Sequence, residues 1–255
     1  MTLKPKKIFG QHFLTNSALC EKITQQIDLN FSQNILEIGP GEGALTKYLK
    51  TKTNNLKLIE IDNEACVILK KKFSELQIIN EDFLKYNLNN LNWDKYTVVG
   101  NFPYNISTQI LFKILDNKYS INQVVGMFQK EVAERICSAP KSKKYGVPSV
   151  LIQAFFNCEI LFDVARENFQ PAPNVDSTVI KLSRNQIINL NCDYDKFVNV
   201  VKAGFSQRRK KLKNALKNFT KLDNTKLKPL ISKRAEELSV FEFIKLTNML
   251  FPNKK

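Results

Sequence analysis

Short β-rich runs alternate with helical stretches over the first two-thirds of the chain, and this alternation constrains the fold most strongly. The expected strands are residues 34–39, 56–61, 77–80, 96–100 and 122–128. The expected helices are residues 17–28, 44–50, 63–74, 107–116 and 150–156. Strands and helices in this order predict an α/β fold with a mostly parallel, doubly wound sheet that is covered on both faces. Residues 158–164 and 177–183 are expected to add an antiparallel pair at the sheet edge.

A basic helical region follows once the β-rich pattern ends near residue 185. Its expected helices are residues 194–205, 207–219 and 234–250. Residues 186–255 carry 16 Lys and Arg against 6 Asp and Glu, and the whole chain has a net charge of +15. A charge that served only solubility would not need to be clustered in this way. We therefore predict two domains, 1–185 and 186–255. The second is expected to bind a polyanion such as nucleic acid, with an affinity that falls as the salt concentration rises.

The cysteines and the N-terminus exclude several classes of protein. The five cysteines are far apart in sequence, and the chain has only one histidine. This composition predicts neither a metal site nor a disulfide framework, and reduced thiols in a cytoplasmic protein are the simpler interpretation. The charged N-terminus has no following apolar stretch, and no segment approaches membrane-spanning length. We expect a cytoplasmic protein with neither a metal nor a membrane partner.

A glycine-rich turn between the first expected strand and helix indicates a nucleoside cofactor. Gly39, Gly41 and Gly43 allow a tight turn and close approach of a ligand. A dinucleotide is one interpretation, because Glu60 stands about 20 residues further on, where dinucleotide-binding folds carry their ribose-binding acid. Glu37 favours S-adenosylmethionine instead, because it would repel a pyrophosphate but accept hydrogen bonds from the ammonium group of an amino acid. Asp82, after the third strand, suits the amino edge of an adenine.

The segment Asn101-Phe102-Pro103-Tyr104, directly after the strand 96–100, indicates an acceptor site. It places an amide, a backbone carbonyl and a phenol ring at one strand end. This set suits a flat, weakly basic amine such as N6 of adenine, whose lone pair is delocalised into the ring. Two hydrogen-bond acceptors would localise that lone pair, and an aromatic face would hold the base. A methyl donor site beside a methyl acceptor site is therefore predicted.

Motifs that carry a family resemblance extend over nearly the whole chain. They are Gly10-Gln11-His12-Phe13-Leu14, the glycine turn, Glu60, Asp82, Asn101–Tyr104, Gln129–Arg135, Tyr145-Gly146, Phe169–Ser177 and Gly204–Leu212. In combination they resemble the small-subunit rRNA adenine dimethyltransferases. This family makes N6,N6-dimethyladenosine on two adjacent adenines of a hairpin loop near the 3′ end of 16S rRNA. Phe102 stands where the family more often has Leu, which keeps an apolar side chain there.

The resemblance implies a role for each matching residue. Gln11, His12, Leu14 and Asn101 look like cofactor-side contacts, Glu37, Gly39 and Gly41 line the methionine part of S-adenosylmethionine, Glu60 binds the ribose hydroxyls, and Asp82 and Phe83 bind the adenine. On the acceptor side, Asn101 and the Pro103 carbonyl would accept hydrogen bonds from the target amine. Tyr104 and Phe169 would sandwich the target base.

The basic residues of the second domain are expected to contact the RNA. Arg208, Arg209, Lys210, Lys211 and Lys213 are expected on one helix that grips phosphates. The basic, turn-rich segment 138–149 is expected to be a mobile loop that faces the substrate. The expected partner is 16S rRNA within an immature small ribosomal subunit, and the protein is expected to act as a monomer.

Three other functions share parts of this pattern. Resistance-type adenine methyltransferases of large-subunit rRNA have the same cofactor turn and an Asn-x-Pro-Tyr motif, but the segment Phe205–Leu212 resembles the small-subunit class. Adenine methyltransferases that act on DNA usually carry Asp at the position of Asn101. A non-catalytic ribosome-assembly factor would keep the fold as an RNA clamp, and the intact Glu60, Asp82, Asn101 and Tyr104 argue against lost chemistry.

Overall fold

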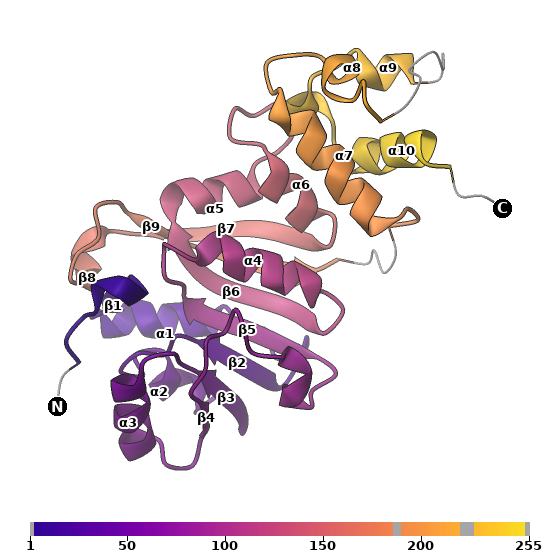
Figure 1. The fold of residues 1–255 in the computed structure, drawn as a ribbon. Coiled ribbons are helices and arrows are strands. Elements are labelled where there is room, and N and C mark those ends of the chain that lie inside the picture. Colours follow the sequence, from indigo (N-terminus) through magenta and orange to yellow (C-terminus); the bar gives the residue numbers. More distant parts are fainter. Residues whose placement is uncertain (1–2, 186–189, 220–226, 253–255) are drawn as a thin grey trace. The chain divides into compact units, whose positions relative to one another are not determined.

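The computed structural model describes residues 3–185, 190–219 and 227–252, and Figure 1 traces the fold. Within these residues seven strands form one sheet. In spatial order they are β4 (Gln77–Ile79), β3 (Asn55–Ile59), β2 (Asn34–Ile38), β5 (Tyr96–Asn101), β6 (Ile121–Gln129), β9 (Ser177–Arg184) and β7 (Phe156–Val164). β4, β3, β2, β5 and β6 run parallel, and β9 is antiparallel to β6. The predicted doubly wound α/β sheet is confirmed.

The order of the strands fixes where a ligand can bind. The chain builds β2, β3 and β4 outward in one direction and then returns to place β5 and β6 on the other side of β2. The connections above β2 and β5 therefore leave in opposite directions. In open α/β sheets the crevice outside the carboxyl ends of two such strands is the usual ligand site.

Helices cover both faces of this sheet. Figure 1 shows α4 in front of the sheet and α1 behind it. In chain order, the α-helices up to residue 153 are α1 (Ser17–Gln25), α2 (Thr46–Leu49), α3 (Asn63–Lys72), α4 (Ser107–Asp116), α5 (Lys130–Cys137) and α6 (Val147–Gln153). Short 3-10 helices occur at Lys7–Phe9, Leu88–Leu91 and Arg166–Asn168. The helices predicted in this region are present, but α1, α2 and α3 are shorter than their apolar patterns suggested, and α6 begins and ends three residues before the predicted helix 150–156.

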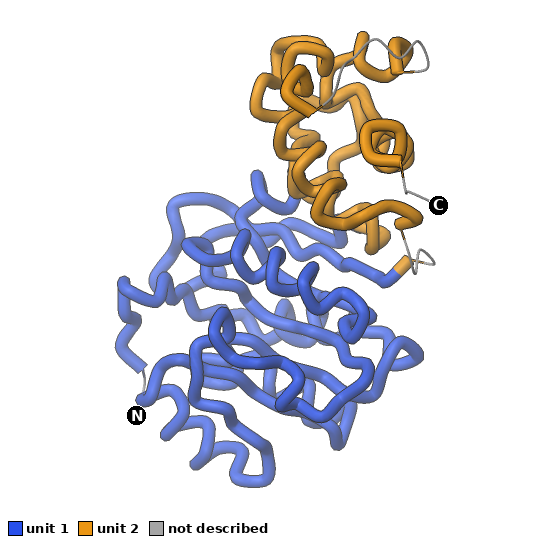
Figure 2. Tube along the Cα trace, turned by 45° about the vertical axis from the view of Figure 1, so that its right-hand side comes forward, with its two compact units in different colours: residues 1–133, 159–184 blue, residues 134–158, 185–255 orange. Residues whose placement is uncertain are grey.

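The described chain forms two compact units, which Figure 2 colours separately. One unit contains residues 1–133 and 159–184, and the other contains residues 134–158 and 185–255. These units differ from the predicted domains 1–185 and 186–255, because residues 134–158 group with the C-terminal helices rather than with the sheet. The reason is that α6 packs against α7 (Tyr194–Ser206) and buries Val150, Leu151 and Ile152.

The C-terminal helices differ in part from the prediction. α7 matches the expected helix, but the predicted helix 207–219 is reduced to α8 (Leu212–Ala215). The backbone leaves the helical conformation at Gln207, and Leu212 N–H donates to the Lys233 carbonyl at 2.8 Å, so tertiary hydrogen bonds replace helical ones. The remaining helices are α9 (Lys228–Ile231), the 3-10 helix Ala235–Glu237 and α10 (Val240–Leu250). No helix in the described ranges is long and apolar enough to cross a membrane.

Tight packing of one aromatic ring holds the end of β5. Phe102 is fully buried and meets Phe128 edge to face, with ring centroids 5.0 Å apart. Gly100 of β5 and Gly126 of β6 make room for it: a Cβ on Gly126 would lie 2.3 Å from the Phe102 ring. Two facing glycines therefore form the seat of the Phe102 side chain.

We predict that Gly126→Ala destabilises the protein by about 1–3 kcal/mol, because the added methyl group overpacks the site of the Phe102 ring. Urea unfolding followed by circular dichroism measures the change. Adding Phe102→Leu to Gly126→Ala shortens the opposing side chain and should restore part of the loss. Equal stability of Gly126→Ala and the wild type would contradict this packing argument.

Candidate functional site

Two adjacent cavities lie at the carboxyl ends of the strands, within the sheet unit. The first, of about 180 Å³, lies where β2, β3 and β5 end, and its lining includes Gln11, His12, Gly39, Gly41, Glu60, Asp82, Phe83, Asn101, Pro103 and Tyr104. The second, of about 420 Å³, is lined on one side by the glycine turn and includes Leu14 and Glu37. Phe13, Gly39 and Asn101 line both cavities. The structure thus brings together the predicted cofactor and acceptor residues, except Phe169.

The glycine turn after β2 leaves room for a ligand. Gly39 has φ +64°, and a Cβ at this position would meet no atom within 4 Å, so the space beside it is the cavity itself. Gly41 has φ +57°, and its N–H donates to Glu60 Oε2 at 3.0 Å. A side chain at Gly39 would be strained and would also project into the cavity.

Glu60 follows β3 and connects two walls of the first cavity. Its side chain is buried, Oε2 accepts from Gly41 N–H, and Oε1 accepts from Asp62 N–H at 2.9 Å. Burial raises the pKa of this carboxyl, and the two backbone hydrogen bonds oppose that rise. Each carboxylate oxygen keeps a further lone pair with which it can accept a hydrogen bond from a ligand hydroxyl.

Glu37 lies on β2 and lines the second cavity. It is 1% exposed, and Oε2 accepts from Thr46 Oγ1 at 2.6 Å. Burial raises its pKa to about 8, although the Thr46 hydrogen bond acts in the opposite direction. Glu37 makes no ion pair with the described residues. A buried acid of this kind is poised to accept a cationic group, because a cation favours its charged form.

Asp82 and Phe83 close another side of the first cavity. Asp82 Oδ1 accepts from Leu84 N–H at 2.8 Å, so this carboxylate also caps a turn. Its Oδ2 accepts no hydrogen bond from the part of the chain that the structure describes. The Phe83 ring is largely buried, and Lys113 Nζ lies 5.2 Å from its centroid.

The end of β5 presents a directed set of polar groups. Asn101 Nδ2 donates to the His12 carbonyl at 2.8 Å, and Oδ1 accepts no hydrogen bond from any described residue. The Pro103 carbonyl accepts from Ile106 N–H at 3.2 Å and keeps its second lone pair. The Tyr104 hydroxyl contacts Ser177 Oγ, and burial raises the pKa of this phenol. Asn101 Oδ1 is therefore oriented by the bond that Nδ2 makes.

The rings of His12 and Phe169 have different surroundings: His12 stacks on Tyr104, and Phe169 packs in the hydrophobic core. The His12 ring stacks on Tyr104 with centroids 5.4 Å apart, and its Nδ1 lies 2.7 Å from the Pro171 carbonyl oxygen. Phe169 is 3% exposed, packs in the hydrophobic core and lines neither cavity. The cause is an antiparallel pairing of β1 (Phe13–Leu14) with β8 (Phe169–Gln170), which no sequence pattern predicted.

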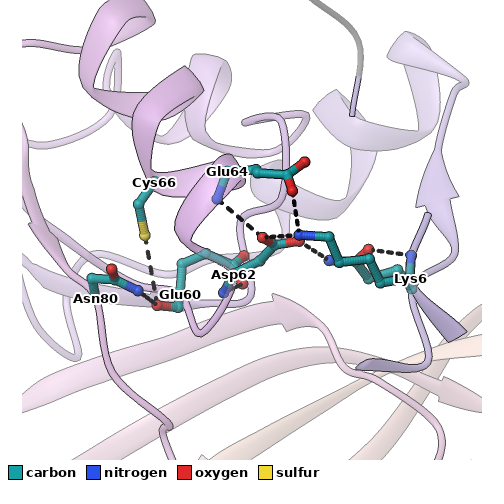
Figure 3. A network of polar contacts seen from close by, with 7 residues as sticks. Lys6, Glu60, Asp62, Glu64, Cys66 and Asn80 are labelled. Atoms are coloured by element: carbon teal, nitrogen blue, oxygen red, sulfur yellow. Dashed lines mark hydrogen bonds and ion pairs between the residues drawn. The ribbon is translucent and has the colours of Figure 1, made fainter. Parts of the chain in front are cut away.

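An ion pair that the sequence patterns did not predict lies beside the first cavity (Figure 3). Lys6 Nζ lies 2.7 Å from Asp62 Oδ1 and 3.0 Å from Glu64 Oε1. Gln11 Nε2 donates to Asp62 Oδ2 at 3.1 Å, and Gln11 Oε1 accepts from Lys6 N–H at 2.8 Å. Asp62 alone carried a signal in the sequence, because an acid directly before an expected helix is a common N-cap.

The basic residues of the C-terminal unit are not on one helix, contrary to the prediction. Arg208, Arg209, Lys210 and Lys211 precede α8, and only Lys213 lies within it. Arg208 is half-buried: Nε donates to Glu236 Oε2 at 2.8 Å, and Nη2 contacts the Ser142 and Lys143 carbonyls. The other four are exposed.

The segment 138–149 is tied within its own unit. Lys141 N–H donates to the Glu236 carbonyl at 2.7 Å, Lys144 pairs with Glu134, and the Tyr145 ring is fully buried.

Among the residues that the structure describes, no group of three or more His, Cys, Asp or Glu side chains could hold a metal ion.

Comparisons with known proteins identify the family of this chain. Residues 2–250 match the family model described as ribosomal RNA adenine dimethylase. Proteins named ribosomal RNA small subunit methyltransferase A are 49% identical in Cytophaga hutchinsonii, over 97% of this chain and 98% of that protein, and 46% identical in Flavobacterium johnsoniae, over 97% and 96%.

Two solved structures share the fold. A dimethyladenosine transferase from Plasmodium falciparum superposes with a TM-score of 0.77 at 24% identity, covering 92% of this chain and 96% of that one. The 23S rRNA methyltransferase ErmE gives 0.72 at 22% identity, covering 93% and 99%. With a family model that spans nearly its whole length, the chain belongs to the ribosomal RNA adenine dimethylase family.

Proposed function

We propose that this protein transfers methyl groups from S-adenosylmethionine to the N6 amino groups of two adjacent adenosines in the 3′-terminal hairpin loop of 16S rRNA. The names of its relatives support small-subunit rRNA as the substrate. The observation that carries the chemistry is the position of the Asn101 side-chain oxygen, Oδ1. It lies at the cavity beside the glycine turn and is oriented by the hydrogen bond from Asn101 Nδ2 to the His12 carbonyl. The proposal also has the enzyme act in the cytoplasm, as a monomer, on an immature small ribosomal subunit.

The fold and the family imply S-adenosylmethionine as the cofactor, and the residues present fit it. Glu37 would hold the ammonium group of its methionine part, and Gly39 leaves room for that part. Glu60 would accept hydrogen bonds from the ribose hydroxyls. Asp82 Oδ2 would accept a hydrogen bond from the adenine amino group, with Phe83 against the ring. When bound, this cofactor supplies an electrophilic methyl group on a sulfonium.

The acceptor residues would position the target amine and localise its lone pair. Asn101 Oδ1 and the Pro103 carbonyl oxygen, through its second lone pair, would accept hydrogen bonds from the two N–H groups of the target amine. This favours a tetrahedral geometry at the N6 nitrogen. Stacking on Tyr104 would contribute about 1–3 kcal/mol. Positioning and acceptors placed where positive charge develops would supply most of the acceleration. A methylated aromatic ammonium is acidic enough to lose its proton to water, so no general base is assigned.

The predicted role of Phe169 requires a change in the position of its side chain. Its ring is packed in the core, so a sandwich of the target base between Tyr104 and Phe169 requires Phe169 to leave that position when RNA binds. An adenine in a single-stranded loop can be unstacked at low cost, which suits a hairpin loop as the substrate.

The exposed cations of the C-terminal unit would bind RNA phosphates. Arg209, Lys210, Lys211 and Lys213 present exposed side chains that can do so, whereas Arg208 is engaged with Glu236 and two loop carbonyls. Arg208 would thus act on RNA mainly by holding the 142–143 loop in place. Phosphate contacts of this kind fix the register of the enzyme on the RNA but carry no sequence information.

We predict that Asn101→Ala lowers methyl transfer to immature small subunits by roughly 10²–10³-fold, as expected when an acceptor in the transition state is removed. S-adenosylhomocysteine should still bind, because Glu37, Glu60 and Asp82 remain. Radiolabelled methyl transfer and calorimetry measure the two effects, with the exposed Asn55→Ala on β3 as the control. Near-normal turnover by Asn101→Ala would exclude the proposed role. Naked RNA and large subunits, tested in parallel, distinguish the possible substrates.

We predict that Arg209→Glu with Lys210→Glu weakens binding to immature small subunits and lowers the dependence of log Kd on log salt by roughly one for each phosphate that is no longer neutralised. Lys71→Glu on α3 is the control, because it changes the charge of the sheet unit at an exposed position. Binding assays over a salt series give both quantities. An unchanged slope in the double variant would mean that these two cations do not bind phosphate.

We predict that the affinity for S-adenosylhomocysteine increases as pH rises towards 8. In the protein without ligand, Glu37 has a pKa of about 8 and is mainly protonated below that pH. The ammonium group of the ligand lowers this pKa, so binding releases a proton. Calorimetry in buffers of different ionisation enthalpy counts the protons released. Glu37→Gln should bind more weakly and without this release, whereas the surface variant Glu75→Gln should match the wild type. Wild-type binding that releases no proton below pH 8 would refute the assignment.

A further inference from the structure

The segment from Leu3 to Leu14 crosses the carboxyl edge of the sheet and is attached at several points; we call it the N-terminal strap. Leu3 N–H contacts Glu42 in the glycine turn, and the His12 carbonyl accepts from Asn101 at the end of β5. Ile8, Phe9, Gly10, Gln11, His12 and Phe13 of the strap line the first cavity. The strap is therefore one wall of the cavity that holds the proposed cofactor.

Apolar packing fastens the middle of the strap only weakly. Lys7–Phe9 is a short 3-10 helix without a buried residue, and the Ile8 side chain is 77% exposed. Polar contacts on either side of Lys7–Phe9 help to hold this part in place, and two of them, from the Lys6 and Gln11 side chains, go to Asp62. Asp62 is 1% exposed and receives Lys6 Nζ, Gln11 Nε2 and Glu64 N–H.

Lys6 has two effects at this point. Its ammonium offsets the charge of Asp62, whose carboxylate would otherwise face the neighbouring buried Glu60 with little compensation. Burial opposes ionisation of Asp62, but hydrogen bonds from Lys6 and Gln11 outweigh it and lower the pKa of Asp62. The Lys6 backbone N–H also fixes Gln11 Oε1 at 2.8 Å, which leaves Gln11 Nε2 directed at Asp62.

A chain of contacts leads from Lys6 to the glycine turn. Asp62 N–H donates to Glu60 Oε1, and Glu60 Oε2 accepts from Gly41 N–H. Figure 3 shows Lys6, Asp62 and Glu64 in direct contact, with Glu60 and Asn80 to the left of Asp62. We propose that Lys6 is a positioning residue: by binding Asp62 it closes the strap over the first cavity and thereby sets the affinity for the nucleoside cofactor.

This proposal rests on the proposed function only in naming the ligand as S-adenosylmethionine or its product. Lys6 itself lines neither cavity. A residue that acts in this way changes the affinity for the cofactor and leaves the chemical step intact. The contribution of Lys6 to cofactor affinity should also depend on salt. The Lys6 side chain is 31% exposed, so solvent ions can screen its pairing with Asp62.

The test is calorimetric binding of S-adenosylhomocysteine to the full chain. Lys6→Met keeps the apolar stem and removes the ammonium, and we expect Kd to rise about tenfold, as for loss of one partner of a partly buried charge pair. Lys6→Arg should restore binding to near the wild-type value. The exposed Lys4→Met, two residues away, is the matched control and should bind like the wild type.

A double-variant cycle isolates the pair. Asp62→Asn keeps the N-cap of α3, since Asn caps as well as Asp, but removes the charge. Lys6→Met together with Asp62→Asn should bind no more weakly than the weaker single variant. Wild-type affinity should fall as salt rises, and the affinity of Lys6→Met should change less. Thermal unfolding midpoints within the range of Lys4→Met show that the variants are folded.

Two further measurements separate positioning from general structure. Hydrogen exchange of residues 6–13 should be faster in Lys6→Met than in the wild type, and steady-state kinetics should show a raised KM for S-adenosylmethionine with kcat nearly unchanged. Lys6→Met that binds as tightly as the wild type, or that lowers kcat at saturating cofactor, overturns the proposal. A wild type that does not bind S-adenosylhomocysteine would instead overturn the proposed function, so the two failures are distinguishable.

Discussion

The hydrogen bonds of the buried Glu60 carboxylate join the strand ends on which the site is built. A carboxylate removed from water must be satisfied by donors, and Glu60 takes them from the backbone of Gly41 and Asp62. The Gly41 amide can face Glu60 because the turn adopts left-handed conformations at Gly39 and Gly41. The glycine turn, the end of β3 and the start of α3 are thus one connected unit. The wall of the cavity takes its shape from the protein alone.

A second constraint holds the acceptor side of the site. Phe102 is fixed in the core by Gly100, Gly126 and Phe128, so the backbone after β5 has little freedom. Asn101, just before this anchor, remains at the cavity and points its amide at the strap. Core packing therefore determines where the polar groups lie, and hydrogen bonding determines how they are oriented. The two effects together place acceptors in a site that is already formed.

Features that leave a local pattern could be predicted from the sequence. Buried parallel strands such as β6 leave continuous apolar runs, and residues after such strands, Glu60 among them, must meet at one edge. Phe169 could not be placed, because its burial depends on a two-residue pairing with Leu14 that has no periodic signal. The segment 207–219 has a helical composition, but hydrogen bonds to residues distant in sequence override it. Lys6 resembled the other surface lysines until its partner 56 residues away was known.

The strap links the cofactor half of the site to the acceptor half. Gln11 is bound to Asp62 at the end of β3, and the adjacent His12 gives its carbonyl to Asn101 and stacks its ring on Tyr104. An ordered strap therefore fixes both the wall beside the cofactor and the direction of the Asn101 acceptor oxygen. Coupling between two sites through one element is reciprocal in free energy. A ligand that binds better to the ordered strap consequently also favours the acceptor geometry that a target amine requires.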